Sequence, residues 1–218
     1  MSVKAVLFDL DGTVMDSGPG IKHSAIATLK EMHLPAPSYE DLNYFIGPPL
    51  RDCFRLSHVP EERVEEAVKI YRKNYEKEKG GYLDANPYPG MIEMLSSLKK
   101  KGYLSFVCTS KGEALAKRIV HAFSLDSLFA GVYGSTLDGK VSKKKDIISL
   151  CLASLSSGSK AVMIGDTYLD IVGANENHIP GIGVTWGYGE KSRMKEVGAV
   201  ALVDNAEECE EKIEEVLD

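Results

Sequence analysis

The sequence predicts an α/β fold in which a doubly wound parallel sheet carries an inserted small helical domain. From about Pro89 onward, short runs rich in Val and Ile alternate with segments of helical periodicity, which is typical of parallel βαβ units. Residues 17–84 break that alternation, because they show several helical patterns and no convincing strand. A length of 218 residues accommodates one sizeable domain together with a smaller insertion.

The first strand is the nearly all-apolar segment 3–8, and the insertion follows it. Prolines divide the insertion into helices, because proline interrupts regular structure. They are Pro35, Pro37, Pro48, Pro49 and Pro60. We therefore expect residues 1–15 and 86–218 to form the α/β core and residues 16–85 to form a helical cap domain.

The remaining core elements are expected to alternate in order along the chain. The helix at 90–102 would end at Gly102, since glycine is favoured just past a helix C-terminus. Further helices are expected at 111–123, 143–155, 168–178 and 205–217. Strands are expected at 103–108, 128–134, 160–165, 181–186 and 199–204.

Composition limits the class of partner and the compartment. The formal net charge of −6 and the pI of about 5.5 argue against nucleic acid or an anionic membrane as a partner. The four cysteines form no C-x-x-C pair, which argues against a disulfide framework and favours a reducing compartment. With neither a signal-peptide core nor a run of about 18 apolar residues, we expect a cytoplasmic protein.

Two pairs of carboxylates follow apolar strands: Asp9 with Asp11, and Asp166 with Asp170. Ligands of open α/β sheets bind beyond the carboxyl ends of the strands, so both pairs are expected at one edge of the sheet. A buried strand that ends in unpaired acids costs free energy unless a positive group lies there. Oxygen ligands from two strand ends suit Mg²⁺, so these four acids are the candidate metal ligands.

Further polar residues complete a candidate phosphate site. Thr109 and Ser110 directly follow the strand at 103–108, where a hydroxyl and helix N-terminal amides can hold an anion. Lys143, Lys144 and Lys145 begin the helix at 143–155, although cations are unfavourable at a helix N-terminus. Either these lysines are solvated, or one of them turns inward to neutralise phosphate and carboxylates.

Together these residues resemble the motifs of the haloacid dehalogenase superfamily, over essentially the whole chain. DLDGT at 9–13 resembles the first motif, Thr109 the second, a lysine of 143–145 the third, and GDTYLD at 165–170 the fourth. The insertion is similar to the helical cap of the phosphoglycolate phosphatase-like branch. The resemblance implies a Rossmann-like core and a Mg²⁺-dependent phosphatase. Its substrate would be a small phosphorylated metabolite, phosphoglycolate-like or a 5'-nucleotide, and its intermediate an aspartyl-phosphate.

The resemblance also implies roles for the residues around the first motif. Asp9 would attack phosphorus as the nucleophile. Asp11 would protonate the leaving oxygen and later deprotonate water, and the Gly12 kink would let Asp11 reach above Asp9. Magnesium would bind the Asp9 carboxylate, the Asp11 main-chain carbonyl and Asp166, with Asp170 ordering the metal or its waters.

The remaining motifs would bind the phosphate group, with Thr109, Ser110 and one lysine holding its oxygens. The lysine is left open, because the family pattern Lys-Pro-x-Pro-acid lacks both prolines here. A Lys-x-acid-Ile ending selects Lys144, with Lys143 as the alternative. In the cap, FIGPPLRDCF at 45–54 resembles the segment that faces the active site, which makes Arg51 a candidate contact for an anionic substrate group.

Other activities remain open on the sequence. A β-phosphoglucomutase-type phosphomutase keeps all four motifs and differs mainly in the cap, and a pyrophosphatase of the same fold also fits. From another class, a non-catalytic receiver-like phospho-switch uses a similar strand-end acid pair, but it is about half this length. It also lacks an acid two residues after the phosphoacceptor. The chain is expected to be a monomer or a homodimer.

Overall fold

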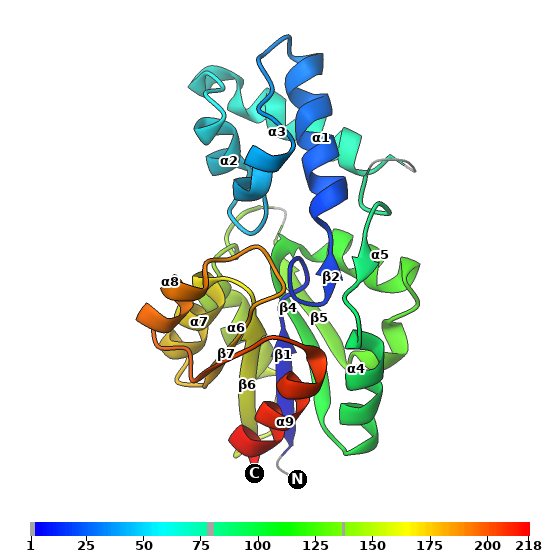
Figure 1. The fold of residues 1–218 in the computed structure, drawn as a ribbon, viewed down its shortest axis with the longest axis vertical. Helices are drawn as coiled ribbons and strands as arrows, with labels where there is room; N and C mark the ends of the chain where they lie inside the picture. Colours follow the sequence, from blue (N-terminus) through cyan, green and yellow to red (C-terminus); the bar gives the residue numbers. More distant parts are fainter. Residues whose placement is uncertain (1–2, 78–80, 137) are drawn as a thin grey trace. The chain divides into compact units, whose positions relative to one another are not determined.

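The computed structural model describes residues 3–77, 81–136 and 138–218, and the chain forms two compact units (Figure 1). The core unit contains the chain up to Met15 and the segment Pro87–Asp218, and the cap unit contains Asp16–Asn86. The chain crosses between the units at β2 (Met15–Asp16) and β3 (Asn86–Pro87), which pair as a two-stranded sheet. The second crossing lies one residue beyond the boundary expected from the sequence.

The core is built on a six-stranded sheet in the order β5-β4-β1-β6-β7-β8, in which every neighbouring pair is parallel. The strands are β1 (Lys4–Phe8), β4 (Leu104–Gly112), β5 (Gly131–Ser135), β6 (Lys160–Gly165), β7 (Gly181–Val184) and β8 (Ala201–Val203). The chain moves outward from β1 in one direction through β4 and β5, and then in the other through β6, β7 and β8. This is a doubly wound sheet whose order reverses beside β1, and it confirms the predicted fold class.

Helices cover both faces of this sheet (Figure 1). They are α4 (Met91–Lys100), α5 (Glu113–Ala122), α6 (Lys144–Ala153), α7 (Tyr168–Glu176), α8 (Lys191–Glu196) and α9 (Ala206–Leu217), with a short 3-10 helix, η3 (Asp126–Leu128). Leu7 of β1 packs with Ile147 of α6 and Ala174 of α7 on one face. Its neighbours Val6 and Phe8, which point to the other face, are equally buried. A central strand buried on both faces explains why β1 reads as a continuous apolar run.

The cap unit is helical, as its proline-divided sequence predicts. It contains α1 (Gly18–Glu31), η1 (Glu40–Phe45), α2 (Leu50–Leu56), η2 (Glu61–Arg63) and α3 (Val64–Tyr75). Pro49 and Pro60 are the N-cap residues, directly before the first residues of α2 and η2. An aromatic cluster holds these helices together, because Phe45 packs edge-on against Phe54 at 5.2 Å between ring centroids and also contacts Tyr71.

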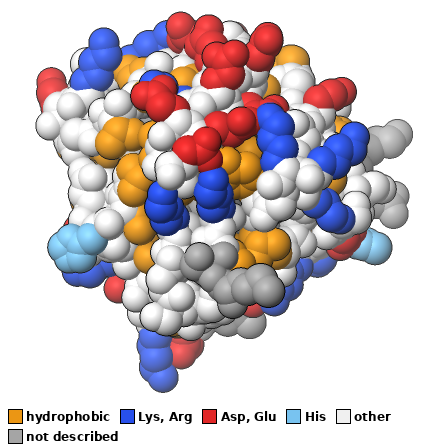
Figure 2. Space-filling view, turned by 90° about the horizontal axis from the view of Figure 1, so that it is seen from below, with side chains coloured by type: hydrophobic (Ala, Val, Ile, Leu, Met, Phe, Trp, Pro, Cys, Tyr) orange, Lys and Arg blue, Asp and Glu red, His pale blue; other side chains and the backbone are white. Residues whose placement is uncertain are grey.

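The surface carries charges of both signs. The face of the core shown in Figure 2 has acidic and basic side chains interspersed, without a continuous basic stripe. Among the described residues, no helix is both long and apolar enough to span a membrane.

Candidate active site

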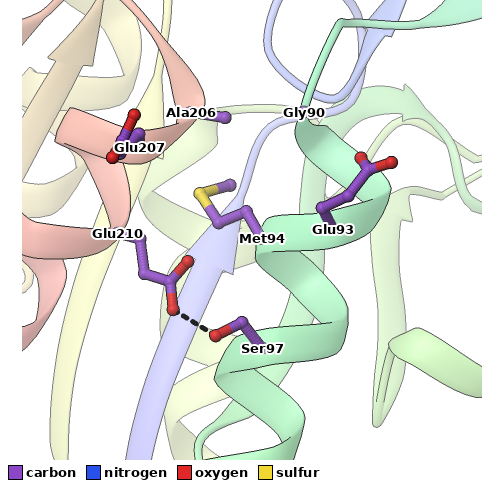
Figure 3. Close-up of a pocket in the computed structure, with 7 residues that line it drawn as sticks. All are labelled: Gly90, Glu93, Met94, Ser97, Ala206, Glu207 and Glu210. Carbon is purple, nitrogen blue, oxygen red and sulfur yellow. Dashed lines mark hydrogen bonds between the residues drawn. The ribbon is translucent and has the colours of Figure 1, made fainter.

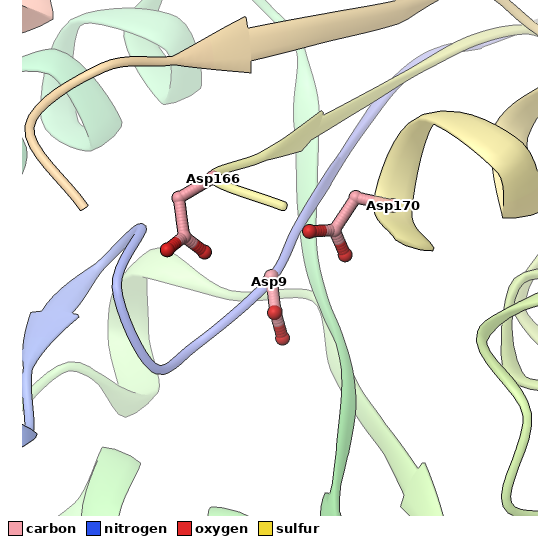
Figure 4. A group of neighbouring side chains, drawn as sticks. All are labelled: Asp9, Asp166 and Asp170. Carbon is pink, nitrogen blue, oxygen red and sulfur yellow. The ribbon is translucent and has the colours of Figure 1, made fainter. Parts of the chain in front are cut away.

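Three carboxylates converge where β1 and β6 end (Figure 4). The two strands are parallel neighbours, and the Asp9 amide donates to the Ile164 carbonyl at 2.9 Å, so Asp9 and Asp166 leave the sheet side by side. Asp170 reaches the same point from the first turn of α7. Each of the three offers a carboxylate oxygen within 4.8 Å of the others, and all three residues are buried. The predicted meeting of the two strand-end acid pairs therefore holds for these residues.

Lys144 is the lysine that joins this cluster. Its Nζ lies 2.8 Å from Asp9 Oδ1 and 2.8 Å from Asp170 Oδ1, and it donates to the Cys108 carbonyl at 3.1 Å. The Lys144 side chain is only 5% exposed. Lys143, the alternative from the sequence, is the exposed N-cap residue of α6 and is not brought to the cluster. Of the two lysines considered from the sequence, Lys144 therefore turns inward to the carboxylates and Lys143 stays at the surface.

Gly173 in α7 provides the space through which the Lys144 side chain passes. A Cβ at position 173 would lie 2.9 Å from Lys144 Cγ, closer than real Cβ atoms approach. The lysine therefore crosses α7 at a point where the helix has no side chain. Packing of this kind fixes the ammonium group between the two carboxylates.

The electrostatics of the cluster are dominated by burial and by excess negative charge. Burial raises the pKa of Asp9 to about 6, against the opposing effect of Lys144. Burial also raises the pKa of Asp166 to about 8, and the charges of Asp170 and Asp9 add to the rise. Burial would lower the pKa of Lys144, but Asp170 and Asp9 outweigh it and hold that pKa above its ordinary value. Asp9 and Asp170 thus share one ammonium group, and Asp166 lies beside them without an ion pair to Lys144 among the contacts described.

This donor set fits a hard divalent cation. All the donors are carboxylate oxygens, and they carry more negative charge than Lys144 balances. Oxygen-only, carboxylate-rich sites suit Mg²⁺ and similar ions. Asp9, Asp166 and Asp170 are the side chains that would hold the ion.

Asp166 is fixed by residues from both sides of the cluster. Its Oδ1 accepts a hydrogen bond from Thr13 Oγ1 at 3.3 Å, and its Oδ2 accepts one from the Tyr188 amide at 2.8 Å. The Trp186 indole in turn donates to the Thr13 carbonyl at 3.1 Å. The loop at 186–189 therefore orients an acid of the cluster. Its contribution is a main-chain amide, which the residue type does not reveal.

Gly12 is required by both its backbone and its surroundings. Its φ is +84°, a conformation that L side chains rarely adopt. A Cβ there would also lie 2.3 Å from Asp166 Oδ2. The kink predicted at Gly12 thus lets the chain after β1 pass directly against Asp166.

Asp11 lies beside the cluster, but its side chain has a different partner. Its Oδ2 is 3.0 Å from Lys111 Nζ, and both side chains are nearly buried, at 12% and 9% exposed. Its Oδ1 is buried and has no hydrogen-bond partner in the described part of the chain. Sequence reasoning missed Lys111, although its position two residues after Thr109 was a usable signal.

Thr109 is buried where it was expected, but the local structure differs from the prediction. β4 runs on to Gly112, so Thr109 and Ser110 lie within the strand and not at the start of α5. Thr109 Oγ1 accepts a hydrogen bond from the Lys111 amide at 3.2 Å. The prediction that helix N-terminal amides follow Thr109 directly is therefore wrong. Thr109 and Ser110 are presented by the irregular end of β4.

Arg51 lies in the cap unit, on α2, and is already paired. Its guanidinium contacts the Glu65 carboxylate through Nε and through Nη2, the second contact at 3.1 Å. Its side chain is 52% exposed. Substrate binding by Arg51 remains a prediction, and it would require exchange of this surface ion pair.

A groove lies elsewhere in the core unit. It has a volume of about 270 Å³ and runs between α4 and α9 (Figure 3). Its floor and rim include Met94, Glu93 and Glu207, together with Glu210, which accepts a hydrogen bond from Ser97. None of the residues that line the groove belongs to the carboxylate cluster. We take the cluster as the candidate active site, because its buried carboxylates and lysine are the groups that carry chemistry.

The family model for haloacid dehalogenase-like hydrolases matches residues 6–184. The chain is 35% identical over 192 residues to a 5'-nucleotidase of Pseudomonas aeruginosa, covering 87% of this chain and 86% of that protein. It is 32% identical over 214 residues to the tyrosine-protein kinase PtkA of Mycobacterium tuberculosis, covering 95% and 72%.

Among solved structures, that of a predicted phosphatase from Clostridium acetobutylicum superposes with a TM-score of 0.90 at 38% identity. The match covers 99% of this chain and 100% of that one. The resemblance inferred from the four motifs is thereby confirmed. The chain belongs to the haloacid dehalogenase-like hydrolase family.

Proposed function

We propose that this protein is a Mg²⁺-dependent phosphatase that hydrolyses a small phosphate monoester through an aspartyl-phosphate on Asp9. The observation that carries the proposal is the buried cluster at the end of β1. Asp9 is held there by Lys144 beside Asp166 and Asp170, and Asp11 lies next to it with one oxygen that no described residue engages. The similarity to a 5'-nucleotidase and to a predicted phosphatase supports the same reaction class.

In the first half of the reaction, a carboxylate oxygen of Asp9 bonds to phosphorus while the ester P–O bond breaks. The departing alcohol takes a proton from Asp11. In the second half, Asp11 removes a proton from water, whose oxygen attacks phosphorus. The bond between phosphorus and Asp9 then breaks, which regenerates the free carboxylate and releases phosphate.

A divalent cation, when bound by Asp9, Asp166 and Asp170, supplies positive charge that offsets the repulsion between an anionic nucleophile and an anionic phosphate. Lys144 adds a second positive group at the same carboxylate, 2.8 Å from Asp9 Oδ1. Its contacts with Asp9 and Asp170 hold it within the site before substrate arrives. Preorganised charges of this kind stabilise the charge that develops during transfer.

Thr109 and Ser110 are proposed to bind the non-bridging phosphate oxygens from the end of β4. Arg51 is the proposed cap contact for a further anionic group of the substrate. Candidate substrates are therefore small phosphorylated metabolites, with phosphoglycolate and 5'-nucleotides as the first to test.

The test is phosphate release from a panel of phosphate esters and pyrophosphate, with Mg²⁺ and with EDTA. Asp9→Asn is the inactive variant, and Asp126→Asn is the matched control, because that acid is exposed and contacts only the surface His121 ring among the contacts described. Release that requires Mg²⁺, survives in the control and is lost in Asp9→Asn supports the proposal. Intact-mass detection of a phosphoenzyme that is absent in Asp9→Asn supports the intermediate.

Other outcomes identify the alternatives. Preferential release from pyrophosphate would make the enzyme a pyrophosphatase. Isomerisation of a sugar phosphate without net release would make it a phosphomutase, and stable phosphorylation of Asp9 without turnover would make it a phospho-switch. Unchanged turnover in Asp9→Asn would refute the mechanism.

A further inference from the structure

We propose that Lys111 is a positioning residue that holds the carboxyl group of Asp11 for proton transfer. The inference rests on the proposed function, because it assigns the Asp11 oxygen that exchanges the proton with the leaving group and with water. Lys111 and Asp11 both belong to the core unit, and their side chains lie 3.0 Å apart between Nζ and Oδ2.

The pair differs from an ordinary surface ion pair in its burial. The side chains of Lys111 and Asp11 are 9% and 12% exposed, whereas the Lys117–Glu113 pair on α5 is 57% and 40% exposed. Exposed pairs hold their side chains loosely and contribute little. A charge-assisted hydrogen bond in a site with little water is shorter and stronger, so it restricts the Asp11 side chain to one orientation.

The two oxygens of Asp11 are therefore not equivalent. Oδ2 is engaged by Lys111, while Oδ1 is buried without a partner in the described residues. A buried carboxylate oxygen left unengaged is costly unless it has a role. Oδ1 is thus the oxygen available to a reacting group. When Oδ1 carries the proton, Oδ2 still accepts the hydrogen bond from Lys111, so the carboxyl group keeps its orientation in both states.

The end of β4 explains how Lys111 reaches this position. The segment from Cys108 to Gly112 faces the shorter segment from Tyr133 to Ser135 of β5, so β4 carries extra residues there. Irregularities of this kind change the direction of the side chains that follow them. The Lys111 amide also donates to Thr109 Oγ1 at 3.2 Å, which ties the lysine to a residue proposed to bind phosphate.

The experiment compares esters whose leaving groups differ in their need for a proton. An alkyl phosphate releases a basic alkoxide and depends on the general acid, whereas dinitrophenyl phosphate releases an acidic phenol and does not. In Lys111→Met we expect kcat/KM for the alkyl ester to fall by ~10–100-fold, as for other misplaced catalytic groups. For dinitrophenyl phosphate we expect a change of less than about threefold. Lys111→Arg should recover part of the lost alkyl activity.

The controls separate this role from a structural one. Lys117→Met removes an exposed lysine and should change neither substrate. Lys111→Gln, which keeps a donor and the side-chain stem, is used if the methionine variant does not fold, with folding judged by circular dichroism. Equal losses with both esters, or a raised KM with unchanged kcat, would overturn the proposal, since either result indicates general destabilisation or direct substrate binding.

Asp11→Asn distinguishes failure of this inference from failure of the proposed function. If Asp11→Asn shows the leaving-group dependence and Lys111→Met does not, only the role of Lys111 is refuted. If Asp11→Asn shows no such dependence, Asp11 is not the general acid, and both proposals fail.

Discussion

Replacing Lys144 by methionine is the most informative single perturbation of the buried cluster. Methionine keeps an unbranched stem of similar length but removes the charge that Asp9 and Asp170 share. All three side chains are almost fully buried, at 5% for Lys144, 8% for Asp9 and 0% for Asp170. Removing one partner of a buried ion pair costs ~3–5 kcal/mol, because it leaves a buried charge uncompensated.

We therefore expect Lys144→Met to lower the free energy of unfolding by about 3–5 kcal/mol in EDTA. That is a large share of the ~5–15 kcal/mol typical of a folded domain. Lys143→Met is the matched control, since it makes the same substitution one residue earlier at an exposed position. Its effect should lie within ~0.5 kcal/mol.

Urea unfolding of both variants, with EDTA and with saturating Mg²⁺, measures these differences. Mg²⁺ should narrow the gap between Lys144→Met and the unmodified protein, because the cation supplies positive charge to the same carboxylates. The turnover of Lys144→Met should still be reduced by ~10²–10³-fold, as when a transition-state donor is removed. Equal stability of the two methionine variants in EDTA would refute the assignment of Lys144 to the cluster.

Three further predictions follow. Gly12→Ala should destabilise the protein by more than the ~1–2 kcal/mol expected from a positive φ alone and should weaken Mg²⁺ binding, because the new Cβ meets Asp166. Gly102→Ala is its control in urea unfolding, since Gly102 has a similar φ of +86° and no atom of the described residues within 4 Å of a new Cβ; equal loss of stability in the two variants would exclude a clash with Asp166. Arg51→Ala should change stability by less than ~1 kcal/mol, because its ion pair is exposed, but should raise KM for substrates with a second anionic group. Arg55→Ala, which removes another exposed ion pair of α2, is the steady-state control, and an equal KM rise in both would remove Arg51 from the site. Burial raises the pKa of Asp166 to about 8 in the folded protein, whereas the ordinary pKa of this carboxyl is 3.8. Between these two pKa values the folded protein keeps a proton on Asp166 that the unfolded chain releases. Stability in EDTA should therefore fall as pH rises from about 5 to 8, and Mg²⁺ should restore more stability at pH 8 than at pH 6 in denaturant titrations; a metal-free stability that rises with pH would contradict this reasoning.

The parts of the site that sequence reasoning located correctly are those attached to regular elements. Asp9 and Asp166 each follow a buried strand, and parallel strand ends meet at one edge of a sheet, so their proximity follows from the strand assignments. Asp170 lies four residues after Asp166, in the first turn of the helix expected to follow that strand. Gly12 was recognised from the turn that the motif requires.

The parts that sequence reasoning missed or supported only weakly depend on local geometry or on distant partners. The sequence selected Lys144 over Lys143 from a motif ending alone, because the residue at which α6 begins is poorly defined by sequence. Lys111 lies only two residues after Thr109, but its contact with Asp11 depends on the irregular end of β4, which the sequence does not show. The pairing of Arg51 with Glu65 joins two helices of the cap, so the sequence around Arg51 could not show it.

The distribution of chemistry between the two units has a consequence for how such a protein diversifies. Asp9, Asp11, Thr109, Lys111, Lys144, Asp166 and Asp170 all belong to the core unit. The chain enters the cap through β2 and leaves it through β3, two short strands that pair with each other. An insertion with adjacent ends can be lengthened, shortened or exchanged without breaking a strand of the main sheet. Changes in the cap can therefore accumulate while the core retains the residues proposed for phosphoryl transfer.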